Sequence, residues 1–192
     1  FPNLAVDVVR HDNHQSAYLA TRHLLDLGHR RIVYLSRDAA ISTVADRLAG
    51  IQAALVEHGL AKDTVTVRTT ETVAEGGYQA IRAIGEESPG TFPYTAVLAY
   101  NDYTALGVQR ALLEAGYQVP CDVSLVACSD SGICDYLSVR LTAVRENWRA
   151  MGRAAFQILR GRLQGDVSPP RAIVLPTELI VRESTTRQES PP

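Results

Sequence analysis

Residues 123–130 read Val-Ser-Leu-Val-Ala-Cys-Ser-Asp, an apolar run that closes on small hydrogen-bonding side chains. Residues 96–102 read Ala-Val-Leu-Ala-Tyr-Asn-Asp and follow the same pattern. Strands that are apolar on both faces are typical of parallel sheets covered by helices on each side. In such open sheets the carboxyl ends of the strands face a ligand crevice. We therefore predict a buried parallel sheet with a binding site beside Asp102 and Asp130.

Strand and helix patterns alternate on the amino-terminal side of these stretches. Apolar residues recur at helical spacing in four segments, and Gly28, Gly59 and Gly116 end three of them. The alternation predicts an α/β fold, a doubly wound parallel sheet. The predicted strands are 4–9, 30–35, 64–68, 95–100 and 123–130. Of the four predicted helices, the first follows Asp12-Asn13, the second runs from Asp46, the third covers 74–87 and the fourth begins at Asn101 or Asp102.

The chain beyond residue 130 adds elements outside this array. A short strand is predicted at 141–144, an amphipathic helix at 148–163 and an extended segment at 172–182, followed by a polar tail from Ser184. A chain of 192 residues with 46% apolar content is long enough for one full domain and part of another.

Charge and cysteine content restrict the function classes. The formal net charge of −2 does not indicate a nucleic-acid or membrane surface. Cys121, Cys128 and Cys134 lack the two-residue gaps of zinc knuckles or redox pairs, so we expect reduced thiols in a cytosolic protein. No apolar run approaches the ~20 residues of a membrane helix. An exported form with a signal peptide stays open as an alternative.

An ordered set of motifs resembles the effector-binding core of the lactose/galactose-repressor (LacI/GalR) class of bacterial transcription regulators. The resemblance implies a fold of periplasmic-binding-protein-like type and covers nearly the whole chain. Each motif alone is weak, whereas the set in family order is specific. The matching segments are Asp12-Asn13, 23–32 (His-Leu-Leu-Asp-Leu-Gly-His-Arg-Arg-Ile), 47–50 (Arg-Leu-Ala-Gly), 96–107, 116–126, 141–144, Met151-Gly152 and 175–184.

The resemblance also implies how the chain is divided. The family core has two lobes, which the chain crosses between three times, and a helix-turn-helix headpiece precedes it. We expect one complete second lobe, a remnant of the first lobe, and contact with operator DNA only through the missing headpiece. The family pattern further implies a homodimer formed by second-lobe helices. The expected ranges are 1–11 and 141–168 for the first lobe, 12–137 and 172–185 for the second, and 186–192 for a polar tail.

Two sites match ligand contacts of the family. Arg47 matches an arginine that reaches ligand oxygens, and its forked donors suit vicinal hydroxyls, carboxylates or phosphate. The alternative for Arg47 is an exposed arginine on the first turn of a helix. Asn101 and Asp102 match a pair at the end of a strand, and the alternative for them is helix capping.

Three further residues are candidates for the cleft. Trp148 matches a residue that lines the cleft from the first lobe, and an indole stacks well on a sugar or a base. A tryptophan facing the core is the alternative. Thr43 matches a loop position with occasional ligand contact, although a solvated threonine is the simpler interpretation. Asp12, at the lobe junction, serves either the cleft or the cap of the next helix.

The sequence departs from the family at two ligand positions. Ser129 stands where the family commonly has an aspartate that grips ligand hydroxyls, and a serine loses the charge. Either Asp130 substitutes for that aspartate or the effector differs from the usual sugars. Thr72 stands where some members have a stacking aromatic residue, which makes Trp148 the more important aromatic candidate.

Catalytic chemistry is hard to build from these residues. The sequence has no glycine-rich phosphate loop after a strand and no Gly-x-Ser-x-Gly elbow, and His11 and His14 lack a third metal ligand. We therefore predict no catalytic residue, metal site or cofactor, and a small polar effector bound between lobes. A solute-binding protein of a transporter is the main alternative, and an enzyme is the third.

Overall fold

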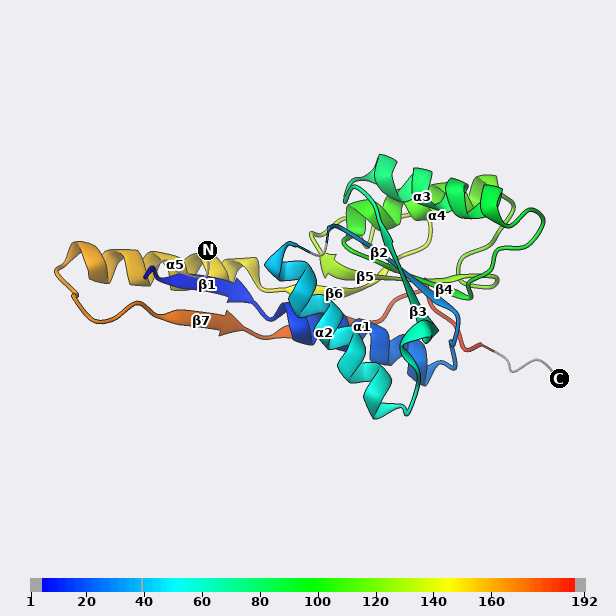
Figure 1. The fold of residues 1–192 in the computed structure, drawn as a ribbon. Coiled ribbons are helices and arrows are strands. Elements are labelled where there is room, and N and C mark those ends of the chain that lie inside the picture. Colours follow the sequence, from blue (N-terminus) through cyan, green and yellow to red (C-terminus); the bar gives the residue numbers. More distant parts are fainter. Residues whose placement is uncertain (1–4, 39, 189–192) are drawn as a thin grey trace.

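The computed structural model describes residues 5–38 and 40–188. It consists of a rounded body and a narrow arm that projects from it (Figure 1). The elements are β1 (Val8–His11), α1 (Asn13–Asp26), β2 (Ile32–Ser36), α2 (Ser42–Glu57), the 3-10 turn η1 (Lys62–Thr64), β3 (Val65–Thr69), α3 (Ala74–Glu87), β4 (Ala96–Ala99), α4 (Asp102–Glu114), β5 (Ser124–Asp130), β6 (Thr142–Glu146), α5 (Trp148–Leu163), β7 (Ala172–Leu175) and β8 (Thr177–Ile180).

The body is a six-stranded sheet in the order β3-β2-β4-β5-β6-β8, in which only β8 runs antiparallel to its neighbour. Helices α1 and α2 cover one face and α3 and α4 the other (Figure 1). In β2, alternate residues enter the two cores, with Tyr34 on the α1/α2 side and Leu35 on the α3/α4 side. The predicted α/β, doubly wound parallel fold is confirmed.

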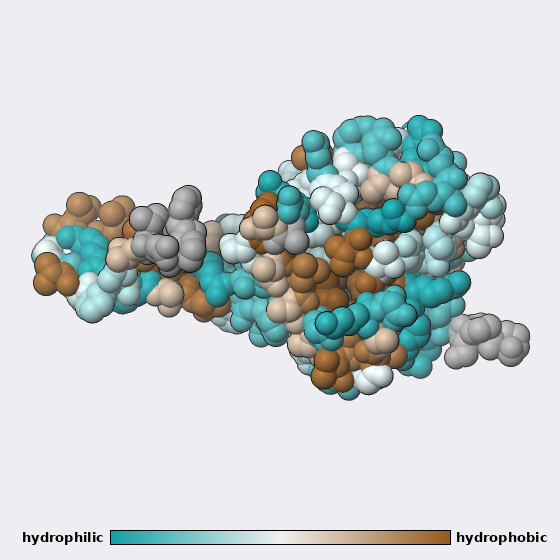
Figure 2. Space-filling model, in the orientation of Figure 1, coloured by the Kyte–Doolittle hydropathy of each residue, from teal (hydrophilic) through white to brown (hydrophobic). Residues whose placement is uncertain are grey.

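The arm contains β1, β7 and α5, and β1 pairs in parallel with β7. It is thinly packed, because Ile158 is the one buried residue of α5 while Phe156 and Leu163 are 63% and 80% exposed. Figure 2 shows apolar residues gathered at the arm's outer end. Asp7, which precedes β1, forms a two-pronged ion pair with Arg162 of α5 at 2.8 and 2.9 Å.

The expected crossing points between the two units need correction. Residues 142–146, expected with the first lobe, form β6 inside the six-stranded sheet, because Ala143 and Val144 enter the body's two cores. Residues 172–175, expected in the second lobe, form β7 in the arm. The chain returns to the body at Pro176, which has no N–H to continue a strand ladder.

Other boundaries differ by short distances. Of the predicted strand 4–9, residue 4 lies outside the described residues and the pairing begins at Val8. Helix α2 begins at Ser42, before the predicted start at Asp46. The tail is polar, as predicted from residue 184, but hydrogen bonds fix it to the body. Ser184 is fully buried and its Oγ donates to the Leu125 carbonyl, and the Gln188 N–H donates to the Leu27 carbonyl. In the described ranges, no helix is both long and apolar enough to cross a bilayer.

Candidate functional site

The carboxyl ends of β2, β4, β5 and β6 lie at one edge of the sheet, as parallel pairing requires. The body joins the arm at this same edge (Figure 1). Arg47 from α2, Asn101 and Asp102 after β4, Ser129 and Asp130 on β5, and Glu146 on β6 all belong to it.

Arg47 is a buried charge with an unused donor. It is 4% exposed, its Nη1 donates to the Tyr100 carbonyl at 2.7 Å, and its guanidinium lies 4.2 Å from the centre of the Tyr100 ring. Its Nε is buried and has no partner among the described residues. Burial disfavours its charge, but the acidic groups of Cys128, Tyr34, Tyr100 and Glu146 around it produce a net rise in its pKa. The alternative of an exposed arginine is therefore excluded.

Beneath Arg47 lies a set of buried hydroxyl and thiol groups that sequence reasoning missed. The Tyr34 hydroxyl and the Ser36 Oγ are both buried without a hydrogen-bond partner in the described chain. Burial raises the pKa of the Cys128 thiol to about 11, while Arg47 lowers it and Glu146 raises it further. Alternation along β2 was the available signal, because it places positions 34 and 36 on one face.

Asn101 makes the contacts of a helix cap. Its Oδ1 accepts from the Thr104 N–H at 2.7 Å and from the Thr104 hydroxyl at 2.8 Å. Its Nδ2 donates to the Thr72 carbonyl at 3.0 Å, which ties β4 to the start of α3. The capping alternative accounts for all of these contacts, and a ligand role for Asn101 stays a prediction.

Asp102 is turned inward. It is 1% exposed, and its carboxylate accepts from both the N–H and the hydroxyl of Ser131 at 2.6 Å. It also accepts from the Tyr103 N–H at 3.0 Å. These contacts fasten the loop after β5 to the start of α4, and a direct ligand role for Asp102 stays a prediction.

Asp130 lies behind an extra residue in β5. Ala127 pairs with Ala143 and Asp130 pairs with Arg145, so three steps along β5 match two steps along β6. Such a bulge turns the following side chain to the other face of the sheet. The Asp130 carboxylate thereby meets Arg182, whose Nη2 donates to it at 2.8 Å, and Arg145 at 3.3 Å.

Ser129 lies within this bulge and is half-buried. It does not accept or donate a side-chain hydrogen bond in the described residues, in contrast to its neighbour Asp130. Of the two candidates at the end of β5, Ser129 is therefore the one whose polar group is unengaged.

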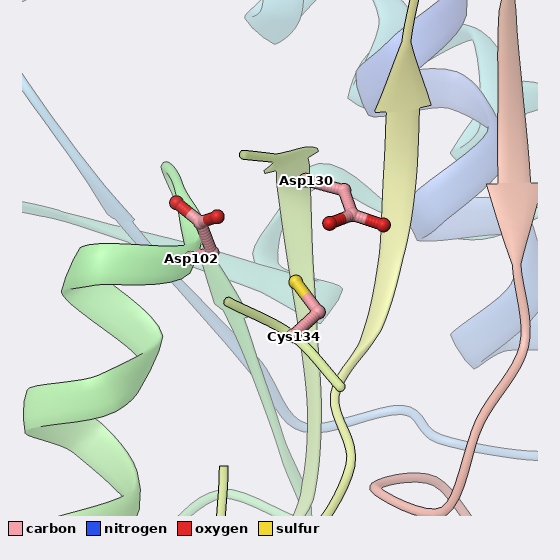
Figure 3. Close-up of side chains that lie close together, drawn as sticks. All are labelled: Asp102, Asp130 and Cys134. Atoms are coloured by element: carbon pink, nitrogen blue, oxygen red, sulfur yellow. The ribbon is translucent and has the colours of Figure 1, made fainter. Parts of the chain in front are cut away.

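Asp102, Asp130 and Cys134 face one another across the loop after β5 (Figure 3). Their ligand atoms lie within 4.8 Å of each other, the spacing of a metal site. The carboxylates already serve Ser131 and Arg182, and burial raises the pKa of Cys134, with further increases from Asp130 and Asp102. Because these side chains already hold the loop after β5 in place, we give the cluster a structural role and assign no metal to it.

Trp148 begins α5 and is 52% exposed, so the alternative of a core tryptophan is wrong. Its indole packs edge-on against the His11 ring, with ring centres 4.7 Å apart. It lines a hollow of about 800 Å³ at the junction of arm and body together with Glu146, Pro176 and Thr177. Its exposed ring at this junction could stack on a ligand, and its predicted role in lining the cleft stays a prediction.

Glu146 is a functional candidate that sequence reasoning missed. Its side chain is 6% exposed, and its Oε1 lies 3.8 Å from the Nδ1 of His11, whose Nε2 is buried without a partner in the described chain. Burial raises the pKa of Glu146 to about 7, with Arg47 lowering it and Asp102 raising it. Burial also lowers the pKa of His11, while a hydrogen bond that the ring donates to the Asn147 backbone raises it.

Thr43, Thr72 and Asp12 occupy the periphery. Thr43 is half-buried in the first turn of α2, not in a loop. Thr72 is half-buried and lines an open hollow of about 630 Å³ between the ends of β2 and β3. Asp12 caps α1 by accepting from the Gln15 N–H at 2.8 Å, as its capping alternative requires. Their ligand roles stay predictions.

Glu146→Gln is expected to change how stability depends on pH. Since the folded protein holds the Glu146 proton up to about pH 7, while the unfolded chain releases it near 4.5, ionisation destabilises the fold as pH rises between these values. The glutamine variant should therefore gain about 3 kcal/mol relative to the parent protein between pH 4.5 and 8. Urea unfolding at the two pH values measures this gain. Glu178→Gln, an exposed position on β8, is the control, and equal pH profiles for both variants would contradict the assignment.

Comparison with protein families matches residues 21–185 to the periplasmic binding protein-like domain. The regulator CelR of Thermobifida fusca is 31% identical over 95% of this chain and 53% of its own length. The regulator GalR of Escherichia coli K12 is 34% identical over 91% of this chain and 50% of its own length. The chain thus spans about half the length of the curated relatives it matches.

Solved structures agree with the sequence comparisons. A LacI family regulator from Enterococcus faecium with bound ribose has a TM-score of 0.86 at 29% identity, over 95% of this chain and 66% of that one. A CelR–cellobiose complex has a TM-score of 0.84 at 30% identity, over 94% and 54%. A dimeric Lac repressor has a TM-score of 0.85 at 25% identity, over 97% and 66%. The chain therefore belongs to the periplasmic binding protein-like family, in the form that this domain takes in LacI/GalR-family regulators.

Proposed function

We propose that this chain is the effector-binding core of a bacterial transcriptional regulator, and that it binds a small sugar-like molecule between the body and the lobe to which the arm belongs. The observation that carries the proposal is Arg47, a buried guanidinium whose Nε has no partner in the described chain, at the carboxyl edge of the sheet. Leaving such a donor unpaired is costly, so a bound ligand or water is its natural partner.

The other groups at the junction suit a hydroxyl-rich ring. Trp148 offers an exposed aromatic face, and Ser129 offers one donor and acceptor site. Two of the similar structures hold ribose or cellobiose, which are neutral polyols. We therefore favour a neutral sugar as the effector class.

The coupling to DNA belongs to the complete regulator. The relatives are helix-turn-helix regulators that are about twice as long as the matched segment. We propose that sugar binding changes the pose of the two lobes and so biases the DNA-binding part between two states. Such a protein acts in the bacterial cytoplasm. CelR and GalR are both regulators, which makes the transporter-receptor alternative less favoured.

A second copy of the chain is the proposed partner of α3 and α4. The outer surface of α4 exposes Tyr103, Leu106 and Leu113, each between 41% and 61% exposed, beside a hollow lined by Tyr78 and Arg110. Exposed aromatic and leucine side chains in one patch favour protein contact. A similar structure is a dimeric Lac repressor, so we propose a homodimer through this face.

Arg47→Lys is expected to weaken sugar binding while the protein stays folded. A lysine retains the charge but loses the forked donors, and charged hydrogen bonds contribute about 1.5–3 kcal/mol, which corresponds to a loss of roughly 10- to 150-fold in affinity. Calorimetric titration with ribose and with cellobiose measures the loss. Arg153→Lys, an exposed position on α5, is the matched control. Equal affinity of the two variants would show that the pocket lies elsewhere.

A further inference from the structure

The end of β5 offers no free carboxylate to a ligand in this protein. Ser129 has no charge, and the bulge in β5 directs Asp130 to the α3/α4 side, where Arg182 binds it at 2.8 Å. The side chains of Asp130 and Arg182 are only 2% and 5% exposed. The Asp130 carboxylate therefore has no oxygen directed into the cleft.

A second carboxyl group faces the side of the sheet on which Arg47 lies. Val144 of β6 packs into the α1/α2 core with Tyr34 and Cys128, and Glu146 follows two residues later on the same face. Arg47 lowers the pKa of Glu146 and Glu146 raises the pKa of Arg47, so the two charges attract each other on this face.

The Glu146 carboxyl is open to a ligand. It is buried and accepts no hydrogen bond from the described residues, and its nearest titratable partner is His11 at 3.8 Å. It also lines the hollow of about 800 Å³ beside Trp148. A buried carboxyl without donors, at the wall of a hollow, has the geometry of a ligand contact.

We infer that Glu146 is the carboxyl group that reads the effector in this protein, replacing the acidic position at the end of β5 with one from β6. The inference rests on the proposed function. A ligand hydroxyl would donate to Glu146 while its oxygen, or that of the adjacent hydroxyl, accepts from Arg47. This donor and acceptor pair specifies vicinal hydroxyls and disfavours an anionic group at the same position.

The charged neighbours of Glu146 make the inference testable by pH. His11 faces it from β1, Arg47 from α2 and Asp102 from the start of α4. Because burial raises the pKa of free Glu146 to about 7, the carboxyl is largely protonated at pH 6 and largely ionised at pH 8. The ionised form is the acceptor, so affinity should fall about tenfold from pH 8 to pH 6, with proton release on binding.

The experiment is calorimetric titration of the protein with ribose and with cellobiose at pH 6 and pH 8, in two buffers of different ionisation enthalpy. The parent protein and Glu86→Gln, whose residue is exposed on α3 and does not line this hollow, should show the tenfold change and proton release. Glu146→Gln should bind more weakly at pH 8 and show neither effect. A Glu146→Gln variant that binds with the parent's affinity and pH dependence would overturn the inference and leave the Arg47 assignment intact.

A second measurement does not depend on a variant. Carbon-13 NMR of the side-chain carboxyl of Glu146 should show that its pKa falls when cellobiose or ribose is added, because a donated hydrogen bond stabilises the ionised form. An unchanged titration in the presence of a sugar that binds would refute the inference. Absence of binding of either sugar to the parent protein at both pH values would instead refute the proposed sugar function, and the inference with it.

Discussion

Arg182→Met is expected to lower the free energy of unfolding by about 3–5 kcal/mol, the cost of removing one partner from a buried ion pair. Arg182 donates to the Asp130 carboxylate at 2.8 Å, to the Leu141 carbonyl at 2.7 Å and to Asp135 at 2.7 Å. Methionine fills much of the volume but leaves Asp130 with the Gly132 N–H and the longer contact to Arg145. The buried charge is then poorly compensated.

Denaturant unfolding at pH 7 measures this loss, and the chain offers a matched control. Arg140 also pairs with a carboxylate, Glu183 at 2.8 Å, but both side chains are more than half exposed. Arg140→Met should therefore cost less than about 1 kcal/mol. The double variant Arg182→Met with Asp130→Asn should recover part of the loss, since the unpaired charge is gone. Equal costs for the two single arginine variants would contradict a buried ion pair between Arg182 and Asp130.

Much of the fold could be predicted because local pattern and tertiary environment agree. Strands β4 and β5 are apolar on both faces because helices cover both faces, and the predicted bounds of α3 and α5 match those observed. The crossing points between body and arm could not be predicted from propensity. Residues 142–146 and 172–175 are both short extended segments, and only their pairing partners decide which unit each joins.

The position of the candidate residues at one edge of the sheet could be predicted, but their surroundings could not. Arg47 was recognised by its motif, whereas its burial depends on Tyr100, which is 53 residues away. The bulge that turns Asp130 away leaves no mark in the alternation of small residues along β5. Glu146 carries no motif, because its importance arises only from burial among residues of β1, α2 and α4. Single-sequence patterns report periodicity, and these features depend on long-range contacts.

Gly107→Ala is expected to destabilise the body by about 3 kcal/mol, although alanine is the better helix former. A Cβ at Gly107 would lie 1.7 Å from the Ala74 carbonyl oxygen, which is backbone and cannot rotate aside, so α3 and α4 would have to separate. Gly152→Ala on α5 is the control: its Cβ would meet no atom within 4 Å, and the fold should gain up to about 1 kcal/mol from helix propensity.

Thermal and urea unfolding of both glycine variants shows whether the steric clash or the gain in helix propensity is larger at each position. A Gly107→Ala protein as stable as Gly152→Ala would mean that α3 and α4 do not approach each other closely at Gly107. Gly50 makes the same kind of contact on the other face, where a Cβ would lie 2.1 Å from the His14 carbonyl. Gly50 thus lets α2, which carries Arg47, approach α1, and Gly107 lets α4, which begins at Asp102, approach α3. Gly107→Ala should accordingly also weaken the hydrogen bond from the Ser131 N–H to the Asp102 carboxylate. A change in the amide NMR signal of Ser131 would report this weakening.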